Sequence, residues 1–504
     1  MDTVSYLLGK NASGGGSSLQ SKEVEITTNT TTNITPDAGY NGLSSVKVIT
    51  DVPSKDIVEK DVNLYDYDGT LLFSYTKDEF ASLSSYPTPP AKELLTFQEW
   101  NWSLADAKQY VAKYGGQCIG ATYTTKDGNT KIHIGLDSFN GETLEDISLN
   151  FYLNVNGSGS GELTINWGDG TSSETSTEYS GSLITKTHSY LNKGDYIISV
   201  GFTPLSGQAK LMFDNGTTTE FITNRGRTVK EVNFGSNIIL YSGSEFYNCI
   251  NLKKVSLPSG IFGTYESGNL SNVFRGCHIL KCVILPSGAK YCNGNMFLDC
   301  NSMEILSIPK SFLTFGTGGT SSQSTLQFDS VLKYLYLPET FTGGLTQLLN
   351  NRPYGYQVIC VPTPATDFLL PTLGAQYGTF NLRKLVVPTG LTTFPYMFGA
   401  VIQHLDIPDN ITALSSFGYW NTLRSVKMSK NVASITSNIF ASSKVRYLYF
   451  TDNVSVPELG GNWTNGNCAY MVFIVPDALY NTWIATEGWA DISDRIIRES
   501  DFNN

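Results

Sequence analysis

The chain has 504 residues, of which 12% are aromatic and 16% charged, and this balance excludes an intrinsically disordered protein. Its net charge of −11, from 34 Lys and Arg against 45 Asp and Glu, argues against nucleic-acid binding, which requires a positive surface to displace counterions from phosphates. No segment approaches about 18 consecutive apolar residues, so no membrane insertion is expected. At roughly 150 residues per domain, the length indicates about three domains.

Residues 1–18 end in Ser-Gly-Gly-Gly-Ser-Ser, a run that cannot bury enough surface to hold one conformation and predicts a flexible segment. The first residues lack the charged region and apolar core of a signal peptide, so we expect folding in a cytoplasm. Residues 19–52 alternate apolar positions such as Val24 and Val46 around a turn-rich stretch, which predicts a small β module.

Residues 53–140 predict an α+β module. Thr76 is placed to cap a short helix, and Ser103 to cap a second helix that Gly115 ends. Residues 117–136 then return to strand character around a tight turn.

Residues 141–205 predict an all-β domain. They contain Trp-Gly-Asp-Gly at 167–170, then His188-Ser-Tyr190, then Gly194-Asp-Tyr196. This order resembles the polycystic-kidney-disease (PKD) domain, and the resemblance implies an immunoglobulin-like sandwich.

The turn after Trp167 has its own physical interpretation. Trp167 is expected to end a buried strand, while Gly168 and Gly170 permit positive φ and Asp169 bonds turn amides. His188 is expected to be a structural histidine and not a catalytic base.

A repeat fills residues 206–475. Each copy reads apolar-x-x-apolar-x-apolar, usually followed by Pro, with a mean step of about 24 residues, within the range of leucine-rich repeats. We expect the first, fourth and sixth residues to point inward and proline to end the strand, because proline has no N–H for the ladder. The eleven copies are 229–235, 252–258, 280–286, 303–309, 332–338, 356–362, 382–388, 402–408, 423–429, 445–451 and 470–476.

Three early copies add Phe-x-x-Cys, which places Cys249, Cys277 and Cys300 on one interior rung. The whole pattern resembles the BspA-like (Treponema-type) leucine-rich repeat and implies a solenoid with a closing cap at 476–504. These cysteines could bind a metal or take part in redox chemistry, but a role as small apolar side chains that fill the interior explains them more simply. All eight cysteines are expected to remain thiols: Cys118, Cys249, Cys277, Cys282, Cys292, Cys300, Cys360 and Cys468.

The motifs of common catalytic and cofactor sites are missing: no phosphate loop, no Gly-x-Ser-x-Gly and no His-Glu-x-x-His occurs. Asp66-Tyr-Asp68-Gly69 loosely mimics the opening of a calcium loop but is expected to form a hairpin turn. Glu142 and Glu145 could be the paired carboxylates of a glycosidase, although such acidic pairs are explained more simply as solvated surface residues. We therefore expect no enzyme activity, no cofactor and no metal.

The second residue of the repeat strand is basic in seven copies, and neighbouring strands would align these charges in one column. The column could dock an anionic polymer such as an acidic cell-surface glycan, or it could only solvate the edge of the solenoid. Tyrosines expected to be exposed beside it suit sugar stacking. The candidate ligand-binding residues are Lys333, Tyr334, Tyr336, Arg446, Tyr447 and Tyr449.

The N-terminal sequence contains Tyr6-Leu7-Leu8-Gly-Lys10, then a glycine run and then residues 19–48. This sequence resembles that of tail or head-fibre proteins from phages of gut bacteria. The resemblance implies a non-enzymatic virion fibre or decoration protein, localised to the virion. Tyr6, Leu7 and Leu8 would anchor it to other virion structural proteins, and the solenoid would bind a host cell-surface glycan or protein. A homo-oligomer, a trimer as in other fibres, is expected. The alternative is a bacterial secreted or surface BspA-like adhesin.

The predicted fold class is therefore multidomain and mainly β. The predicted domains are a flexible particle anchor (1–18), a small β module (19–52), an α+β module (53–140), a PKD-like β-sandwich (141–205), the leucine-rich-repeat solenoid (206–475) and a C-terminal cap (476–504).

Overall fold

The computed structural model divides the chain into two compact units, residues 1–58 and 59–504. In the first unit, β1 (Leu19–Glu25) pairs in parallel with β2 (Gly42–Ile49). The structure describes residues 19–25, 42–49, 59–136, 146–153, 160–179, 183–206, 209–212, 228–240, 246–262, 273–291, 296–314, 331–342, 357–365, 384–394, 402–417, 422–440, 443–464 and 466–502.

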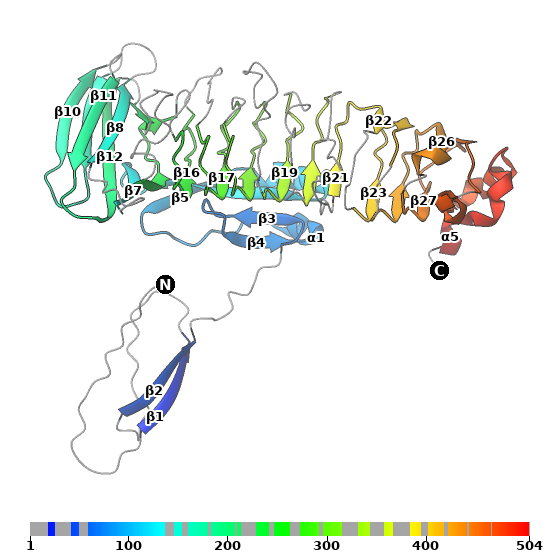
Figure 1. The fold of residues 1–504 in the computed structure, drawn as a ribbon, viewed down its shortest axis with the longest axis horizontal. Coiled ribbons are helices and arrows are strands. Elements are labelled where there is room, and N and C mark those ends of the chain that lie inside the picture. Colours follow the sequence, from blue (N-terminus) through cyan, green and yellow to red (C-terminus); the bar gives the residue numbers. More distant parts are fainter. Residues whose placement is uncertain are drawn as a thin grey trace. The chain divides into compact units, whose positions relative to one another are not determined.

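Residues 59–125 form a four-stranded sheet with two helices, which we call the cover module (Figure 1). The strand order is β4-β3-β6-β5. Strand β6 lies against the solenoid, where it contacts β16 (Lys254–Ser256), β17 (Cys282–Ile284), β18 (Ile305–Ser307) and β19 (Tyr334–Tyr336). The elements are β3 (Val62–Tyr65), β4 (Leu71–Tyr75), α1 (Lys77–Ser82), β5 (Leu95–Trp100), α2 (Leu104–Tyr114) and β6 (Gln117–Thr125).

The local predictions for this module are confirmed. Ser103 caps α2, and Gly115 ends it in the left-handed region at φ 72°. The Asp66–Thr70 segment is a hairpin turn, in which Asp66 N donates to Thr70 O at 2.8 Å and Thr70 N donates to Asp68 Oδ1 at 3.0 Å.

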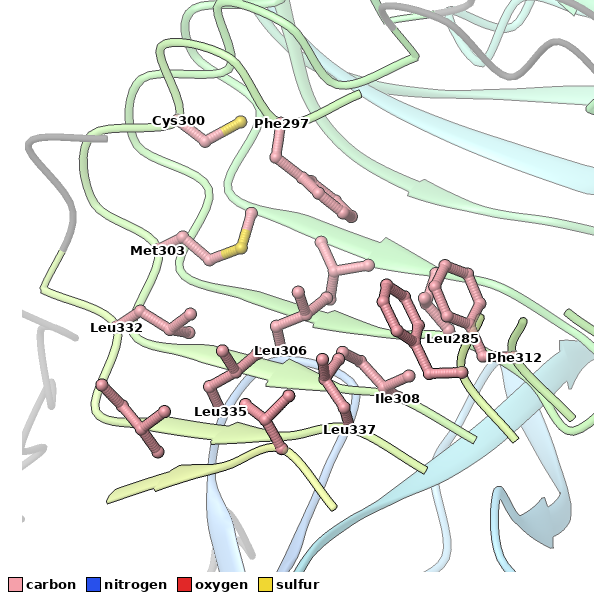
Figure 2. Close-up of a cluster of buried hydrophobic side chains, with 14 of the residues drawn as sticks. Leu285, Phe297, Cys300, Met303, Leu306, Ile308, Phe312, Leu332, Leu335 and Leu337 are labelled. Carbon is pink, nitrogen blue, oxygen red and sulfur yellow. The ribbon is translucent and has the colours of Figure 1, made fainter. Parts of the chain in front are cut away.

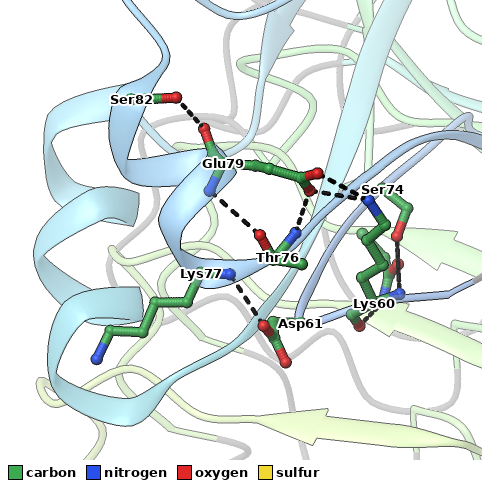
Figure 3. A network of polar contacts seen from close by, with 8 residues as sticks. Lys60, Asp61, Ser74, Thr76, Lys77, Glu79 and Ser82 are labelled. Atoms are coloured by element: carbon green, nitrogen blue, oxygen red, sulfur yellow. Dashed lines mark hydrogen bonds and ion pairs between the residues drawn. The ribbon is translucent and has the colours of Figure 1, made fainter.

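Helix α1 begins with a reciprocal capping box (Figure 3). Glu79 N donates to Thr76 Oγ1 at 3.2 Å, and Thr76 N donates to Glu79 Oε2 at 2.7 Å. Lys60 Nζ also contacts the Glu79 carboxylate at 2.9 Å, which ties the helix to the strand edge. The two terminal N–H groups are thereby satisfied.

Replacing Thr76 by alanine should destabilise α1 by about 1 kcal/mol, because the cap loses its side-chain acceptor. Hydrogen–deuterium exchange of the α1 amides should then be roughly fivefold faster than in the wild type. Ser84→Ala, an exposed change just beyond the helix, is the control. Unchanged exchange in Thr76→Ala would contradict the assigned cap.

Two further sheets follow the cover module. The first runs β10-β9-β12-β7-β14-β16 and the second runs β11-β8-β13-β15. Buried residues from both belong to one hydrophobic core. Their strands are β7 (Thr130–Leu136), β8 (Asp146–Leu153), β9 (Ser160–Asn166), β10 (Glu174–Tyr179), β11 (Leu183–Ser189), β12 (Gly194–Ser206), β13 (Ala209–Met212), β14 (Val229–Asn233) and β15 (Ile238–Ile239).

The Trp167 turn has the predicted features, whereas the immunoglobulin-like assignment of its domain stays a prediction. Trp167 is buried, and Gly168 and Gly170 have φ of 81° and 86°. Asp169 accepts from Thr171 N at 3.0 Å and contacts His188 Nε2 at 2.8 Å, while the His188 ring stacks on Trp167. These contacts lower the pKa of Asp169, chiefly through its hydrogen bonds to Thr171 and His188, and give His188 a structural role.

The first sheet continues into the solenoid. Strand β7 pairs antiparallel with both β12 and β14, and β14 pairs in parallel with β16. The boundaries expected at 140/141 and 205/206 are thus crossed by one hydrogen-bonded sheet.

Short parallel strands, one per repeat, form the solenoid, as the repeat pattern predicted (Figure 1). Pairing is in register, for example Leu335 opposite Ile359 and Val426 opposite Leu448. The strands are β16 (Lys254–Ser256), β17 (Cys282–Ile284), β18 (Ile305–Ser307), β19 (Tyr334–Tyr336), β20 (Val358–Cys360), β21 (Lys384–Val386), β23 (His404–Asp406), β25 (Ser425–Lys427), β27 (Tyr447–Tyr449) and β29 (Val472–Val475).

The inward positions are confirmed. Leu332, Leu335 and Leu337 are the first, fourth and sixth residues of one copy, and all three are buried. Figure 2 shows them stacked beside the equivalent side chains of the neighbouring copy. Cys277 and Cys300 are also buried on the interior rung, where each thiol donates to a backbone carbonyl, Phe246 O and Phe274 O respectively.

A second row of strands lies away from the main one, and a cap closes the C-terminal end. The fully buried Trp483 and Trp489 pack on the core residue Phe450. None of the helices in the described residues has the length and apolarity needed to cross a bilayer. The remaining elements are β22 (Thr393–Phe394), β24 (Ala413–Leu414), β26 (Ser434–Thr436), η1 (Ser437–Ile439), β28 (Glu458–Gly460), η2 (Gly466–Tyr470), η3 (Asp477–Leu479), α4 (Tyr480–Ala485), η4 (Ala490–Arg495), β30 (Ile496–Arg498) and α5 (Glu499–Phe502).

Candidate functional site

The cover module hides part of the outer face of the solenoid. Tyr334 and Tyr336 retain only 5% and 6% of their exposure, because their rings pack among apolar side chains of the module. The expectation that these two tyrosines are exposed is therefore wrong. Their role in binding a ligand is untested, but a ligand on the surface of the folded chain has little access to either ring.

Polar contacts fix this packing. Tyr110 OH on α2 donates to Leu337 O at 2.8 Å, and Trp102 Nε1 donates to Ile308 O at 2.7 Å. Asn101 Nδ2 donates to Leu285 O at 2.9 Å. Burial raises the pKa of both Tyr110 and Tyr336, so the hydroxyls stay protonated.

Lys333 also takes part in the contact between the cover module and the solenoid. Its ammonium lies 3.5 Å from Glu59 Oε1 and 3.9 Å from Glu304 Oε2. Glu59 also accepts from Tyr334 OH at 2.5 Å. The predicted site at Lys333, Tyr334 and Tyr336 thus lies in an interface within the chain.

We divide the cationic column into a first ladder, from Lys230 to Lys333, and a second ladder, Arg424 and Arg446. Backbone hydrogen bonds align neighbouring members: Lys253 N donates to Lys230 O, Lys333 N donates to Glu304 O, and Arg446 N donates to Arg424 O at 2.7 Å. Acidic side chains neutralise much of the first ladder, through Lys230–Asp195 and Lys281–Glu304 pairs at 2.5 and 3.7 Å. Arg383 lies outside the described residues.

The second ladder surrounds a hollow of about 370 Å³ lined by Arg424, Lys444, Val445 and Arg446, which we call the basic hollow. Lys444 and Arg446 are exposed and form no ion pair with an acidic side chain in the described parts of the chain. Like charges 4 Å apart repel by about 1 kcal/mol in water. A bound anion would offset that repulsion.

Aromatic side chains flank the basic hollow. The Arg446 guanidinium lies 5.2 Å from the ring centre of Tyr470, which is 68% exposed. Tyr447 is 37% exposed and Tyr449 half-buried, and both contact Phe502 of α5. The predicted group Arg446, Tyr447 and Tyr449 therefore remains partly accessible, unlike its counterpart on β19.

The exposure of the described outward-facing residues changes between the cover module and the C-terminal cap. Lys384 and Val386 on β21 are half-buried, and burial lowers the pKa of Lys384. On the next strand of the row, β23, His404 and Asp406 are both exposed. Access to this face thus increases toward the basic hollow.

The structure describes some of the other predicted sites but not all of them. Among the described residues, no group of three or more His, Cys, Asp or Glu is arranged to hold a metal ion. Burial raises the pKa of Cys277 and Cys300, which keeps these thiols protonated. Tyr6, Leu7 and Leu8, Cys292, and Glu142 with Glu145 lie outside the described residues.

Sequence reasoning missed Lys444, which precedes the repeat strand and falls outside the column of second residues. The run Lys444-Val-Arg446 contains two cations on alternate positions, and that alternation was the available signal. The cover module's docking had no comparable local signal.

Comparison with protein families identifies the repeat. Residues 224–327 and 375–462 match the family model of the BspA type leucine rich repeat region, in six copies. These segments are BspA-type leucine-rich repeats, as the pattern predicted.

The chain is also similar to two solved structures. One is a leucine-rich repeat protein from Bacteroides ovatus, with 12% identity over 55% of this chain and 97% of that chain and a TM-score of 0.23. The other is a leucine rich cell surface protein from Faecalibacterium prausnitzii, with 14% identity over 56% of this chain and 92% of that chain and a TM-score of 0.19. No curated protein sequence shows significant similarity to the chain.

Proposed function

We propose that the chain is a non-enzymatic attachment protein whose solenoid binds acidic groups of a cell-surface polymer at the basic hollow. The observation that supports this most directly is the gathering of Arg424, Lys444 and Arg446 around one hollow in a chain of net charge −11.

The chemistry of the hollow suits carboxylate, sulfate or phosphate groups. Guanidinium groups bind such anions through two parallel hydrogen bonds, and lysine adds a point charge. Tyr470 and Tyr447 offer apolar rings with a polar edge, which suit the faces of sugar residues. A solenoid also exposes a continuous surface along which an extended polymer can lie.

The test is binding of the full chain to immobilised polygalacturonate and heparin. Lys444→Ala/Arg446→Ala should weaken binding at least tenfold, since each hydrogen bond to a charged group contributes about 1.5–3 kcal/mol. Binding of the wild type should also weaken steeply between low and physiological salt.

Lys253→Ala/Lys290→Ala is the matched control, because both lysines are exposed, lie outside the basic hollow and change the net charge equally. The proposal fails if the two double variants bind alike, or if the wild type binds neither polymer.

We further propose that a phage particle carries the protein, with Tyr6, Leu7 and Leu8 at the point of attachment to other virion proteins. The resemblance of the N-terminal text to phage fibre proteins supports this assignment. Mass spectrometry of purified virions should detect the chain. Recovery of the chain only from bacterial envelopes would favour the surface adhesin instead. We also propose that the chain forms a trimer, which light scattering of the full chain should detect.

A further inference from the structure

A second hollow, of about 650 Å³, lies where the cover module meets three successive turns of the solenoid. Trp100, Trp102 and Asp106 line it from the module, and Ser287, Ser311 and Thr340 line it from the turns after β17, β18 and β19. Its volume is typical of small-molecule sites, which span about 300–1,000 Å³. We call it the junction cleft.

The indole rings in the junction cleft are held in fixed positions. Trp100 Nε1 donates to Pro87 O at 3.1 Å and Trp102 Nε1 donates to Ile308 O at 2.7 Å. Tyr86, another lining residue, packs against Trp100 with ring centres 5.8 Å apart. Trp100 and Trp102 are only 6% and 3% exposed, so they form the fixed floor of the cleft, and its accessible apolar surface comes from the half-buried Tyr86 and Leu104.

The hydroxyl groups of the turns are arranged as acceptors. Ser311 Oγ donates to Ala289 O and Thr340 Oγ1 donates to Lys310 O, both at 2.8 Å. Because each hydroxyl proton is already used, the remaining lone pairs can only accept hydrogen bonds.

The carboxylates add further acceptors. Glu99 Oε1 accepts from Ser287 Oγ, and Glu99 Oε2 has no hydrogen-bond partner among the described residues. Asp106 pairs with Lys310 at 2.5 Å, so Glu99 leaves the cleft with one net negative charge. This charge disfavours anions and favours ligands with several hydroxyl donors.

An unsatisfied hydroxyl lies in the same lining. Tyr86 OH is buried without a hydrogen-bond partner among the described residues. A buried polar group left in this state costs about 1–3 kcal/mol.

We propose that the junction cleft binds a neutral saccharide. Sugar rings offer apolar C–H faces to Tyr86 and Leu104, and hydroxyl protons to Glu99, Ser311 and Thr340. The site is separate from the basic hollow, whose cations select anionic groups.

The experiment titrates the full chain with maltopentaose, cellopentaose and mannopentaose, followed by tryptophan fluorescence and calorimetry. At least one should bind and change the emission. Glu99→Gln should weaken that binding about tenfold, through loss of a charged acceptor at nearly constant shape. Thr340→Trp places bulk at an exposed lining position and should abolish it. Glu487→Gln, at an exposed carboxylate elsewhere, should bind like the wild type.

The proposal is overturned if no pentasaccharide binds at millimolar concentration, or if both cleft variants, folded by circular dichroism, bind like the wild type. Lys444→Ala/Arg446→Ala distinguishes the two sites. It should retain pentasaccharide binding even though it loses binding to polygalacturonate, so failure of either proposal leaves the other measurable.

Discussion

Replacing Phe274 by alanine should lower the free energy of unfolding of the solenoid by about 3–5 kcal/mol, the range for deleting a fully buried phenylalanine ring. Phe274 has no exposed surface and stacks between Phe246 and Phe297, with ring centres 5.4 and 5.9 Å away. Because each coil contacts only its neighbours, the cavity would weaken both flanking interfaces at once. Urea denaturation followed by far-UV circular dichroism measures the loss.

His278→Ala is the control, since His278 is an exposed residue of the same coil and should change stability by less than about 0.5 kcal/mol. A Phe274→Ala chain that unfolds at the wild-type urea concentration would show that the stacked rings do not support the solenoid.

Replacing Tyr110 by alanine should release the cover module from the solenoid while keeping the helix. Alanine is the best helix former, so α2 is not weakened locally. The variant loses the ring that lies 6.4 Å from Tyr336 and the hydrogen bond to Leu337 O. Loss of a buried aromatic side chain costs about 3–5 kcal/mol, which favours opening of the interface.

Thiol labelling measures that opening. Cys118, Cys282 and Cys360 are buried in the interface, where burial raises the pKa of Cys118 and Cys282 well above the ordinary value and that of Cys360 to about 12. They should react with iodoacetamide at least tenfold faster in Tyr110→Ala, as opening exposes them and restores a normal pKa.

The interior thiols Cys277 and Cys300 are the internal standard, because they belong to the solenoid core and not to this interface. Their labelling should be unchanged in Tyr110→Ala. Gln109→Ala, on the exposed side of the same helix, should leave all five thiols protected. Equal acceleration of both groups would indicate general unfolding and contradict local release.

Much of the local structure could be predicted because it depends on near neighbours in the chain. The cap of α1 by Thr76 and the positive φ of Gly168 follow from side chains and turns within a few residues. The inward Leu332, Leu335 and Leu337 follow from a repeat whose burial needs only the next copy.

The candidate sites were harder to predict for the opposite reason. The basic hollow combines Arg424 with Lys444 and Arg446 from the next copy, so the repeat spacing indicated two of its three cations. The junction cleft joins Glu99 and Trp102 to Ser311 and Thr340, which lie about 200 or more residues further along the chain. No spacing rule relates positions that meet only through docking.

Comparison of two copies of the repeat distinguishes burial that depends on the local sequence from burial that depends on distant parts of the chain. Strands β19 and β27 have the same residues, Tyr-Leu-Tyr, and in both the central leucine faces the interior and is fully buried. The outward Tyr334 is 5% exposed and its counterpart Tyr447 is 37% exposed. Inward burial follows from the repeat itself, since it requires only stacked neighbours. Outward exposure depends on whether a distant module covers the strand, because desolvation of a surface side chain is decided by whatever packs over it.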